Sequence, residues 1–249
     1  MNNILKMASC LMVFAVTFSF VACKSEPKKS ASEQQSINSS SSSNVSTSKI
    51  HDEKQNELKK YLELAQKYDK KPGKENEIEA LKWWTKAAEL GDAGAQYTVG
   101  LSYFTGIGAE QNLKTAQSWF LKSAQQGHID AQYRAGLIYA ESLNNDNKAF
   151  ECYYKAAQQG HKDAQLQLAH CYANGKGVKK DAKEAFTWYK KSAEQGDPFA
   201  QMYLAGCYYK GLGTTKDINK AKEWYEKAAK HEDTAELVKI ELEEIKNGN

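Results

Sequence analysis

Residues 184–213 read EAFTWYKKSAEQGDPFAQMYLAGCYYKGLG, and close variants of this stretch recur along most of the chain. The variants begin near residues 82, 115 and 149, and the repeated positions return after 36 residues, or after 33 in one copy. A period of this length is typical of a stack of similar helical units, each burying its apolar face against its neighbours. A single catalytic domain gives no reason for such repetition, so the repeat indicates the fold.

One helix of each unit, helix B, carries a small residue, an aromatic residue and another small residue at positions i, i+4 and i+7. This spacing places all three on one face of an α-helix. In successive copies the aromatic position is Trp83, Trp119, Cys152, Trp188 and Trp224. A second aromatic residue follows it in every copy. We expect the small residues to let a neighbouring helix approach while the ring fills the space between the two backbones.

Both ends of helix B carry residues that favour helix boundaries. An Asn or Asp that can accept hydrogen bonds from free backbone N–H groups precedes each copy. These predicted N-caps are Asn76, Asn112, Asn145, Asp181 and Asp217. Most copies end at a glycine, which suits the left-handed position after a helix. The two histidines His128 and His161 stand at the cap position of the following helix, so a structural role is predicted for both.

The following helix, helix A, carries an alanine, then a Gly or Ala, then a tyrosine. Three copies of helix A end in Gly-x-Gly, and one shorter copy has residues 141–144 instead. No strand pattern precedes these glycines and no phosphate-binding GxxxxGK[ST] motif occurs, so they are predicted to be turns between helices. Helix A and helix B together form one repeat.

The pattern AxxxxGxxYxxGxG…D…KAxxWYxKAAExG resembles the Sel-one-like repeat, a helix pair of the tetratricopeptide type. The resemblance implies an all-α fold, a right-handed α-solenoid of about five repeats whose A helices line a concave surface. We expect this solenoid to occupy residues 51–249, with capping helices at 54–68 and 234–247. The last helix has a polar face, which we expect to point outward, made of Glu241, Glu243, Glu244 and Lys246.

The tetratricopeptide pattern, mapped onto this chain, places eight residues on or near the concave face. They are Tyr97, Phe104, Tyr133, His170, Asn174, Met202, Tyr209 and Lys210. Aromatic and methionine side chains with a few polar groups are suited to anchoring a protein or peptide partner. For each tyrosine alone, packing within the repeat is the competing interpretation. The partner and the oligomeric state stay open.

The N-terminus has the pattern of an exported protein. A short basic start precedes an apolar run of about 16 residues, the size of a signal-peptide core and too short for a comfortable membrane span. Ala22-Cys23 resembles the bacterial lipobox, which implies a lipoprotein signal peptide at residues 1–22 and a fatty acid, such as palmitate, on Cys23. The alternative is an ordinary cleaved signal peptide with a chance cysteine. We expect a lipid anchor in the cell envelope, on the outer membrane or facing the periplasm in a diderm bacterium.

The segment after the anchor is predicted to be a disordered tether. Residues 24–50 contain 11 serines and almost no apolar side chains. Such a segment cannot bury enough surface to offset its loss of conformational entropy on folding. Residues 23–50 are therefore expected to link the membrane to the solenoid.

The sequence gives no strong signal for chemistry. With 34 Lys and Arg against 31 Asp and Glu, and no basic run interleaved with aromatics, nucleic-acid binding is not expected. No histidine pair has metal-ligand spacing, and no cofactor is predicted. Two Ser-x-x-Lys matches, Ser25–Lys28 and Ser46–Lys49, lie in the predicted tether, so the chain is not expected to be an enzyme. Binding of cell-wall glycan, or binding or hydrolysis of β-lactams, as associated with a cysteine-rich branch of the family, is the alternative function.

Three cysteines lie in the predicted solenoid: Cys152, Cys171 and Cys207. The cysteine-rich branch pairs cysteines eight residues apart across the turn from helix B to helix A, and this chain has Ala and Gln at those positions. A Cys152–Cys171 disulfide between adjacent helices is possible in an oxidising compartment. We favour small buried thiols.

Overall fold

The computed structural model describes residues 43–246, and residues 45–249 form one compact unit. The predicted signal peptide, Cys23 and most of the predicted tether lie outside the described residues. The described residues form helices and turns, without a strand. In chain order the elements are α1 (Ser43–Asp69), α2 (Lys74–Glu89), α3 (Ala93–Thr105), α4 (Leu113–Gln125), α5 (Ile129–Leu137), the π-helix η3 (Ile138–Ser142), α6 (Asp146–Gln158), α7 (Lys162–Asn174), α8 (Ala182–Glu194), α9 (Pro198–Lys210), α10 (Ile218–Ala228), α11 (Glu232–Ala235) and α12 (Lys239–Lys246).

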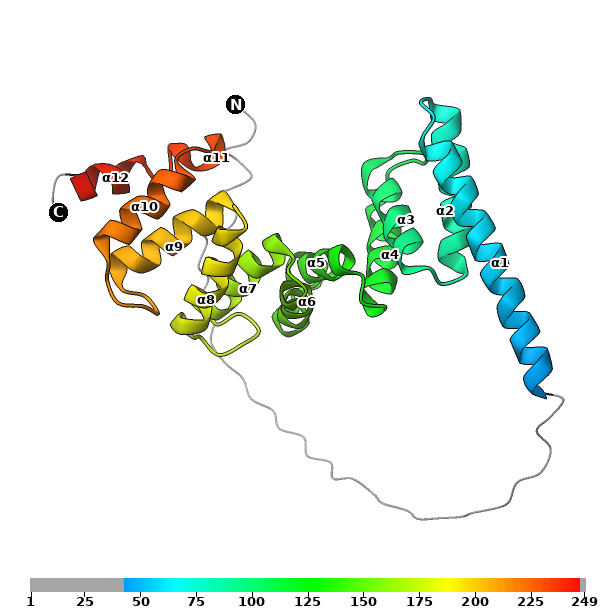
Figure 1. The fold of residues 1–249 in the computed structure, drawn as a ribbon, viewed down its shortest axis with the longest axis horizontal. Helices are drawn as coiled ribbons and strands as arrows, with labels where there is room; N and C mark the ends of the chain where they lie inside the picture. The colour runs from blue at the N-terminus through cyan, green and yellow to red at the C-terminus, as the bar shows by residue number, and fades with distance from the viewer. Residues whose placement is uncertain (1–42, 247–249) are drawn as a thin grey trace, which may run out of the picture. The chain divides into compact units, whose positions relative to one another are not determined.

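The predicted fold class is confirmed: the chain is an all-α solenoid of helix pairs. The predicted A helices are α3, α5, α7 and α9, and the predicted B helices are α2, α4, α6, α8 and α10. From α2 to α10 each helix packs against the next one along the chain, whereas α11 packs on α9 and α12 on α10 (Figure 1). Sequence neighbours are therefore spatial neighbours throughout the repeats.

Short polar side chains begin most helices as predicted. The side chains of Asn112, Asn145, Asp181 and Asp217 each accept a hydrogen bond from a backbone N–H in the first turn. The two histidines act in the same way through Nδ1, His161 accepting from the Ala164 N–H at 3.2 Å. The exception is Asn76, because α2 begins earlier, after Gly73, and the Asn76 amide donates to the Pro72 carbonyl instead.

In four of the five B helices, α4, α6, α8 and α10, the second position of the aromatic pair lies in the core. Phe120, Tyr153, Tyr189 and Tyr225 are 3–5% exposed, whereas most of the tryptophans before them are half-buried. A Cβ atom added to Gly100 would lie 2.7 Å from the Phe120 ring, and one added to Gly136 would lie 2.4 Å from Tyr153. These two helix pairs therefore need glycine for their close approach.

The tryptophans lie at the edge of the core under lysine side chains three residues further along the helix. The ammonium group of Lys122 lies 4.1 Å from the Trp119 ring, that of Lys191 3.8 Å from Trp188, and that of Lys227 3.7 Å from Trp224. Each is a cation–π contact, and Trp119 and Trp224 are partly open to water whereas Trp188 is buried. In these B helices the second aromatic ring fills the core, and the tryptophan before it covers the edge of the core.

The Gly-x-Gly turns join one repeat to the preceding one. A Cβ atom at the second glycine would lie 2.5 Å from the Glu77 carbonyl oxygen for Gly108, and 2.1 Å from that of Asp146 for Gly177. Both glycines have positive φ, 75° and 67°. The turns therefore press against the start of the previous B helix, which supports their prediction as turns between helices. The shorter copy has η3 at this point instead.

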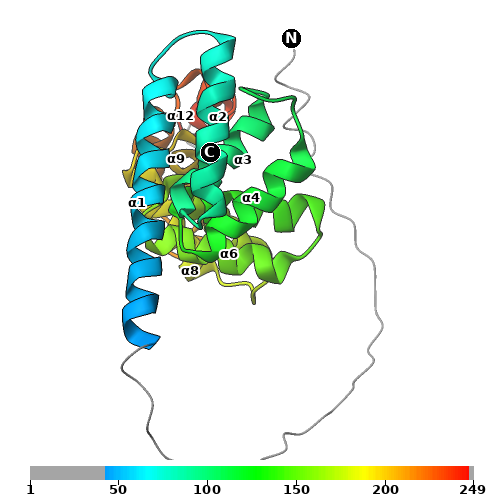
Figure 2. The same cartoon turned by 90° about the vertical axis from the view of Figure 1, so that its right-hand side faces the viewer.

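The two predicted capping helices differ from the structure in their bounds. The predicted helix at 54–68 is α1, which begins at Ser43, inside the predicted tether. No Gly or Pro interrupts residues 43–69, and Leu58 and Leu62 pack on the core of α2 and α3, so the helix extends from that contact. Figures 1 and 2 both show α1 beside α2.

The predicted helix at 234–247 is broken into α11 and α12. Residues 236–238 form the break, and it brings Val238 into the core, where it is fully buried. Thr234 is also fully buried and donates a hydrogen bond to the Ala228 carbonyl. The break therefore changes which face α12 turns toward the repeats. Within residues 43–246, no helix is both long enough and apolar enough to cross a membrane.

Candidate functional site

A hollow of about 360 Å³ lies where α8, α9, α10 and α12 meet, and we call it the C-terminal hollow. Its walls are largely aromatic and apolar, formed by Tyr189, Met202, Tyr203 and Tyr225. Tyr203 is 39% exposed and stacks on Tyr189 with ring centroids 5.3 Å apart. Its volume lies in the range of small ligand sites, and it has the concave, mostly apolar character of such sites.

The hollow exists because one position of helix A carries glycine in this repeat. Gly206 stands 36 residues after His170, and Tyr225 stands 36 residues after Tyr189. One repeat earlier, the His170 ring fills the space and its Nδ1 lies 2.9 Å from the Tyr189 hydroxyl. At Gly206 an added Cβ atom would meet only the Tyr225 hydroxyl, at 3.6 Å. The missing side chain leaves this space open.

The hollow is lined by one buried carboxylate oxygen and by two exposed lysines. Oε2 of Glu241, on α12, is buried and has no hydrogen-bond partner among the described residues. Lys180 and Lys210 also line the hollow, and both are exposed. Burial and then the charge of Glu241 raise the pKa of Tyr225 to about 12, so this hydroxyl stays protonated at neutral pH. The hollow thus holds an unpaired carboxylate oxygen beside tyrosine hydroxyls, with ammonium groups nearby.

Of the eight predicted partner-binding residues, Met202 and Lys210 line the hollow and His170 lies beside it. The His170 ring contacts Tyr189 and lies 4.6 Å from Tyr203 in an edge-on arrangement. Burial lowers the pKa of His170 from 6.5 to about 4, so the ring is neutral at pH 7. The exposed Asn174 donates to the His170 carbonyl oxygen. Tyr209 is half-buried, with the Lys216 ammonium 5.6 Å from its ring.

The other three predicted residues lie in earlier repeats. Tyr97 stacks on His128 at 4.7 Å between centroids, and Tyr133 stacks on His161 at 4.6 Å. Both tyrosines are half-buried, and each stacks on the histidine that caps the next A helix. Packing within the solenoid therefore covers much of the surface of both side chains. Phe104 is 40% exposed, and the Arg134 guanidinium lies 5.3 Å from its ring. These three do not join the C-terminal hollow.

Sequence reasoning missed three residues of the hollow. Glu241 was expected on the outward polar face of the last helix, and this expectation is wrong for its Oε2 atom, because the break before α12 turns that residue inward. The sequence pattern around Tyr203 did not mark it as a site residue. Gly206 did carry a signal, since a glycine replaces the histidine found at the same position one repeat earlier.

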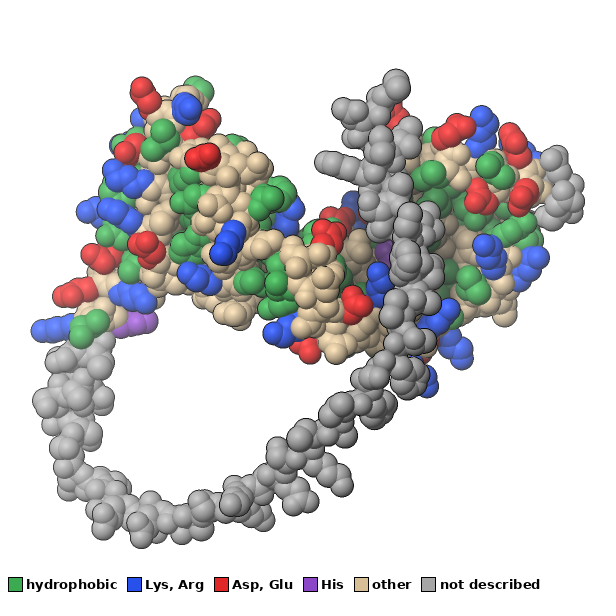
Figure 3. Space-filling view, turned by 180° about the vertical axis from the view of Figure 1, so that it is seen from behind, with side chains coloured by type: hydrophobic (Ala, Val, Ile, Leu, Met, Phe, Trp, Pro, Cys, Tyr) green, Lys and Arg blue, Asp and Glu red, His purple; other side chains and the backbone are tan. Residues whose placement is uncertain are grey.

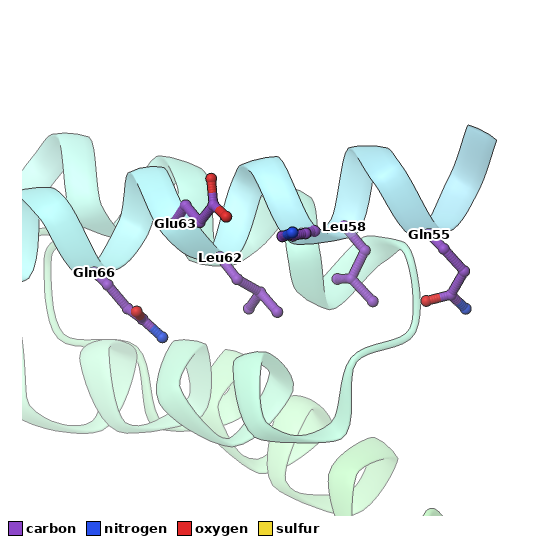
Figure 4. Close-up of a pocket in the computed structure, with 6 residues that line it drawn as sticks. Gln55, Leu58, Leu62, Glu63 and Gln66 are labelled. Atoms are coloured by element: carbon purple, nitrogen blue, oxygen red, sulfur yellow. The ribbon is translucent and has the colours of Figure 1, made fainter. Parts of the chain in front are cut away.

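A second, smaller hollow of about 220 Å³ follows α1. The side chains of Gln55, Leu58, Leu62 and Gln66 project from the same side of the helix (Figure 4). All of its lining residues come from this one helix, so it has no opposite wall to hold a ligand. We therefore take the C-terminal hollow as the candidate site.

The family of the chain follows from the repeat itself. The model of the Sel1 repeat matches five consecutive segments, residues 62–92, 93–128, 129–161, 162–197 and 198–233. The chain belongs to the Sel1 repeat family. From the second segment on, each Sel1 repeat consists of an A helix and the B helix after it, so the C-terminal hollow is lined by repeats four and five and by α12. Sel1 repeat proteins are helical-repeat scaffolds for protein interaction and are generally not catalytic.

Solved structures of Sel1 repeat proteins resemble this chain. The crystal structure of a Sel1 repeat protein from Oxalobacter formigenes is 36% identical, has a TM-score of 0.60, and matches over 64% of this chain and 68% of that one. A protective antigen present in uropathogenic Escherichia coli strains, which displays an SLR fold, is 31% identical with a TM-score of 0.51 over 69% of this chain. The match covers 45% of that antigen. A search of the curated proteins gives no match.

In this Sel1 repeat chain, glutamines occupy the positions at which the cysteine-rich branch is expected to carry disulfides. The Nε2 atoms of Gln96, Gln165 and Gln201 each donate to the carbonyl oxygen of the alanine eight residues earlier. The Oε1 atom of Gln165 also accepts from Nε2 of Gln195 at 2.8 Å. The glutamines therefore link each of these A helices to the B helix of the preceding repeat, and Gln165 is also linked to the end of the B helix that follows it.

The three cysteines of the repeats are free thiols in the structure. Cys171 and Cys207 are buried, and burial raises the pKa of each thiol to about 11. Cys152 is half-buried, and burial raises its pKa as well. These thiols are protonated at neutral pH and serve as small apolar side chains.

Neither a metal site nor a basic surface stands out. Among residues 43–246, no group of three or more His, Cys, Asp or Glu side chains could hold a metal ion. On the face seen in Figure 3, acidic and basic side chains are interspersed. That pattern suits a solvated helical surface and gives no support for a nucleic-acid interface.

Proposed function

We propose that this Sel1 repeat chain is an exported, lipid-anchored scaffold that binds a protein or peptide partner through the concave face of its A helices. The observation that carries the proposal is the C-terminal hollow, where the predicted face residues Met202 and Lys210 meet an aromatic wall. Half-exposed aromatic and methionine side chains are frequent anchors in protein interfaces. The interaction role of Sel1 repeats as a class points the same way.

The membrane attachment rests on the sequence of the N-terminus. The apolar run that ends at Ala22-Cys23 supports export and acylation of Cys23. The Ser-rich segment after it would let the repeats reach a partner at some distance from the membrane. A single acyl chain binds membranes only marginally, so stable anchoring needs the further acyl chains of a lipoprotein modification.

The binding proposal can be tested by co-purification from membranes. The full chain is captured, and bound proteins are identified by mass spectrometry for the wild type and for the double variant Phe104→Ala, Met202→Ala. We expect a stoichiometric partner that the double variant loses. The matched control is Leu113→Ala, Leu143→Ala, because both leucines are 53% exposed but lie at the start of α4 and in the turn after η3. A partner retained by the first variant, or lost equally by the control, contradicts the proposal.

The anchor is tested separately by metabolic labelling with a fatty acid. Cys23→Ser should abolish incorporation of the label and leave the helical content of the repeats unchanged. A variant that is still labelled would refute the anchor at Cys23. Loss of the anchor alone would not change the affinity of the repeats for a partner in solution.

A chromogenic β-lactam distinguishes the scaffold from the alternative function. We expect no hydrolysis by the purified chain, since both Ser-x-x-Lys matches lie before the repeats, in the predicted tether. Hydrolysis above the buffer rate would overturn the assignment as a scaffold without catalytic activity.

A further inference from the structure

The C-terminal hollow contains a buried carboxylate oxygen that has no partner among residues 43–246. Buried polar atoms in proteins nearly always have hydrogen-bond partners, because an unpaired one costs free energy. Oε2 of Glu241 is buried and has none among the described residues. Lys180 and Lys210 line the same hollow, yet neither hydrogen-bonds to this oxygen. Because Glu241 lines the hollow, a group bound there is placed to supply the missing partner.

The walls around Glu241 favour a cation over other ligands. The hollow is lined by the rings of Tyr189, Tyr203 and Tyr225, and the π-face of a tyrosine ring attracts positive charge. An anion would be repelled by the Glu241 carboxylate, and an apolar group would leave that carboxylate unpaired. A metal ion is disfavoured, because Glu241 is the one carboxylate in the lining and no metal-holding group occurs among residues 43–246.

We propose that the C-terminal hollow binds a lysine or arginine side chain of the partner protein, with Glu241 pairing its charge and the tyrosine rings enclosing its stem. This inference rests on the proposed function and specifies the chemistry of the partner. The exposed Lys180 and Lys210 give the outer part of the hollow positive charge. The basic side chain should therefore be flanked by acidic residues, which those lysines attract.

Among the equivalent positions of repeats two to five, only repeat five has a glycine that opens this space. In repeat four the His170 ring occupies the equivalent space and contacts Tyr189. In repeat five Gly206 leaves that space empty, and an added side chain would first meet the Tyr225 hydroxyl at ordinary contact distance, 3.6 Å from Cβ. Gly206→His should therefore close the hollow in the manner of repeat four while the helix is retained.

Met202 supplies a direct probe of occupancy. The chain has four methionines, and the other three are Met1, Met7 and Met12, within the predicted signal peptide. In the full chain with ¹³C-labelled methionine methyl groups, the Met202 signal is assigned by its loss in Met202→Leu. The probe is n-butylammonium, which has the stem and charge of a lysine side chain. Butyrate and 1-butanol are the matched anionic and neutral probes.

We expect n-butylammonium to shift the Met202 signal in a saturable manner, and butyrate and 1-butanol to give much weaker shifts. Glu241→Gln should weaken n-butylammonium binding about tenfold or more, since it removes one partner of a desolvated charge pair. Glu243→Gln is the control, because Glu243 is exposed on the same helix and the charge change is identical. In Gly206→His, n-butylammonium should no longer shift the Met202 signal, while the circular dichroism spectrum should show that the helices are retained.

Three other outcomes would contradict either the cation site or the proposed scaffold function. Equal shifts with 1-butanol, or unchanged n-butylammonium binding in Glu241→Gln, would overturn the inference by showing an apolar hollow only. If Glu241→Gln and Gly206→His bind n-butylammonium poorly yet capture the same partner from membranes as the wild type, the partner assignment is wrong and the proposed scaffold function stands. If the wild type captures no partner, the proposed function fails, whatever the cation binding shows.

Discussion

The hydroxyl group of Tyr189 lies 2.9 Å from Nδ1 of His170, across the contact between α8 and α7. Burial lowers the pKa of His170 to about 4, whereas the unfolded chain takes up the proton near pH 6.5. Below pH 6.5 the unfolded state therefore binds more protons than the folded state. The stability of the fold is full above pH 6.5 and declines as the pH falls toward 4, by about 3 kcal/mol from this one residue.

Urea unfolding at pH 7.5 and at pH 4.5 measures this loss. His170→Leu should remove this part of the pH dependence, because leucine does not titrate. The substitution should fit the fold, since Leu101 and Leu137 occupy the equivalent positions of repeats two and three. His231→Gln is the control and should keep the wild-type dependence, because His231 is exposed. An unchanged pH dependence in His170→Leu would show that His170 is protonated in the folded chain.

Two helical glycines should respond in opposite directions to alanine. Gly206→Ala should stabilise the fold by about 0.5–1 kcal/mol, because alanine favours the helix and its Cβ would make only an ordinary contact with Tyr225. Gly100→Ala should destabilise it by about 1–3 kcal/mol, because its Cβ would lie 2.7 Å from the Phe120 ring. Thermal unfolding of both variants is the measurement, and a change of the same sign in both would contradict the packing described.

The glutamine contacts between helices should matter for stability. Gln165 donates to the Ala157 carbonyl oxygen at 3.2 Å and accepts from Gln195 at 2.8 Å. Gln165→Leu leaves these buried groups unpaired and should cost about 1–3 kcal/mol in the free energy of unfolding. Gln158→Leu, at an exposed position of α6, is the control and should change it by less than about 0.5 kcal/mol. A similar cost in both variants would argue against a special role for Gln165.

The free thiols should react at unequal rates. Under native conditions Cys152 should be alkylated by iodoacetamide first, because Cys171 and Cys207 are buried and burial raises the pKa of both to about 11. Peptide mass mapping follows each cysteine, with urea-unfolded chain as the reference for complete reaction. If the Cys152 and Cys171 peptides gain mass only after reduction, the two residues are joined by a disulfide.

The repeats could be predicted well from the sequence because each position is represented several times. Five copies of one pattern fixed which helices form and where most of them begin and end, including the histidine caps His128 and His161. The start of α1 could not be predicted in the same way, because no Gly or Pro marks it. The ends of the chain have no further repeat against which to compare them.

The candidate site was harder to predict because it depends on what is missing. Gly206 and Glu241 create the hollow together, yet one contributes only the absence of a side chain and the other lies on a helix outside the repeat. The inward orientation of Glu241 depends on the break at residues 236–238, which follows from packing of Val238 and Thr234. Periodicity within one helix carries no information on such a break.

The glycine turns also indicate which junction between repeats should separate first under a pulling force. Gly108, Gly177 and Gly213 each press on the B helix of the preceding repeat, but repeat three has η3 in place of this turn. The buried clusters change close to this place, within repeat three, since the large cluster begins with α6 and two small clusters serve the helices before it. In a single-molecule pulling experiment, the junction between repeats two and three should yield first, leaving the C-terminal hollow folded while the N-terminal part of the repeats extends.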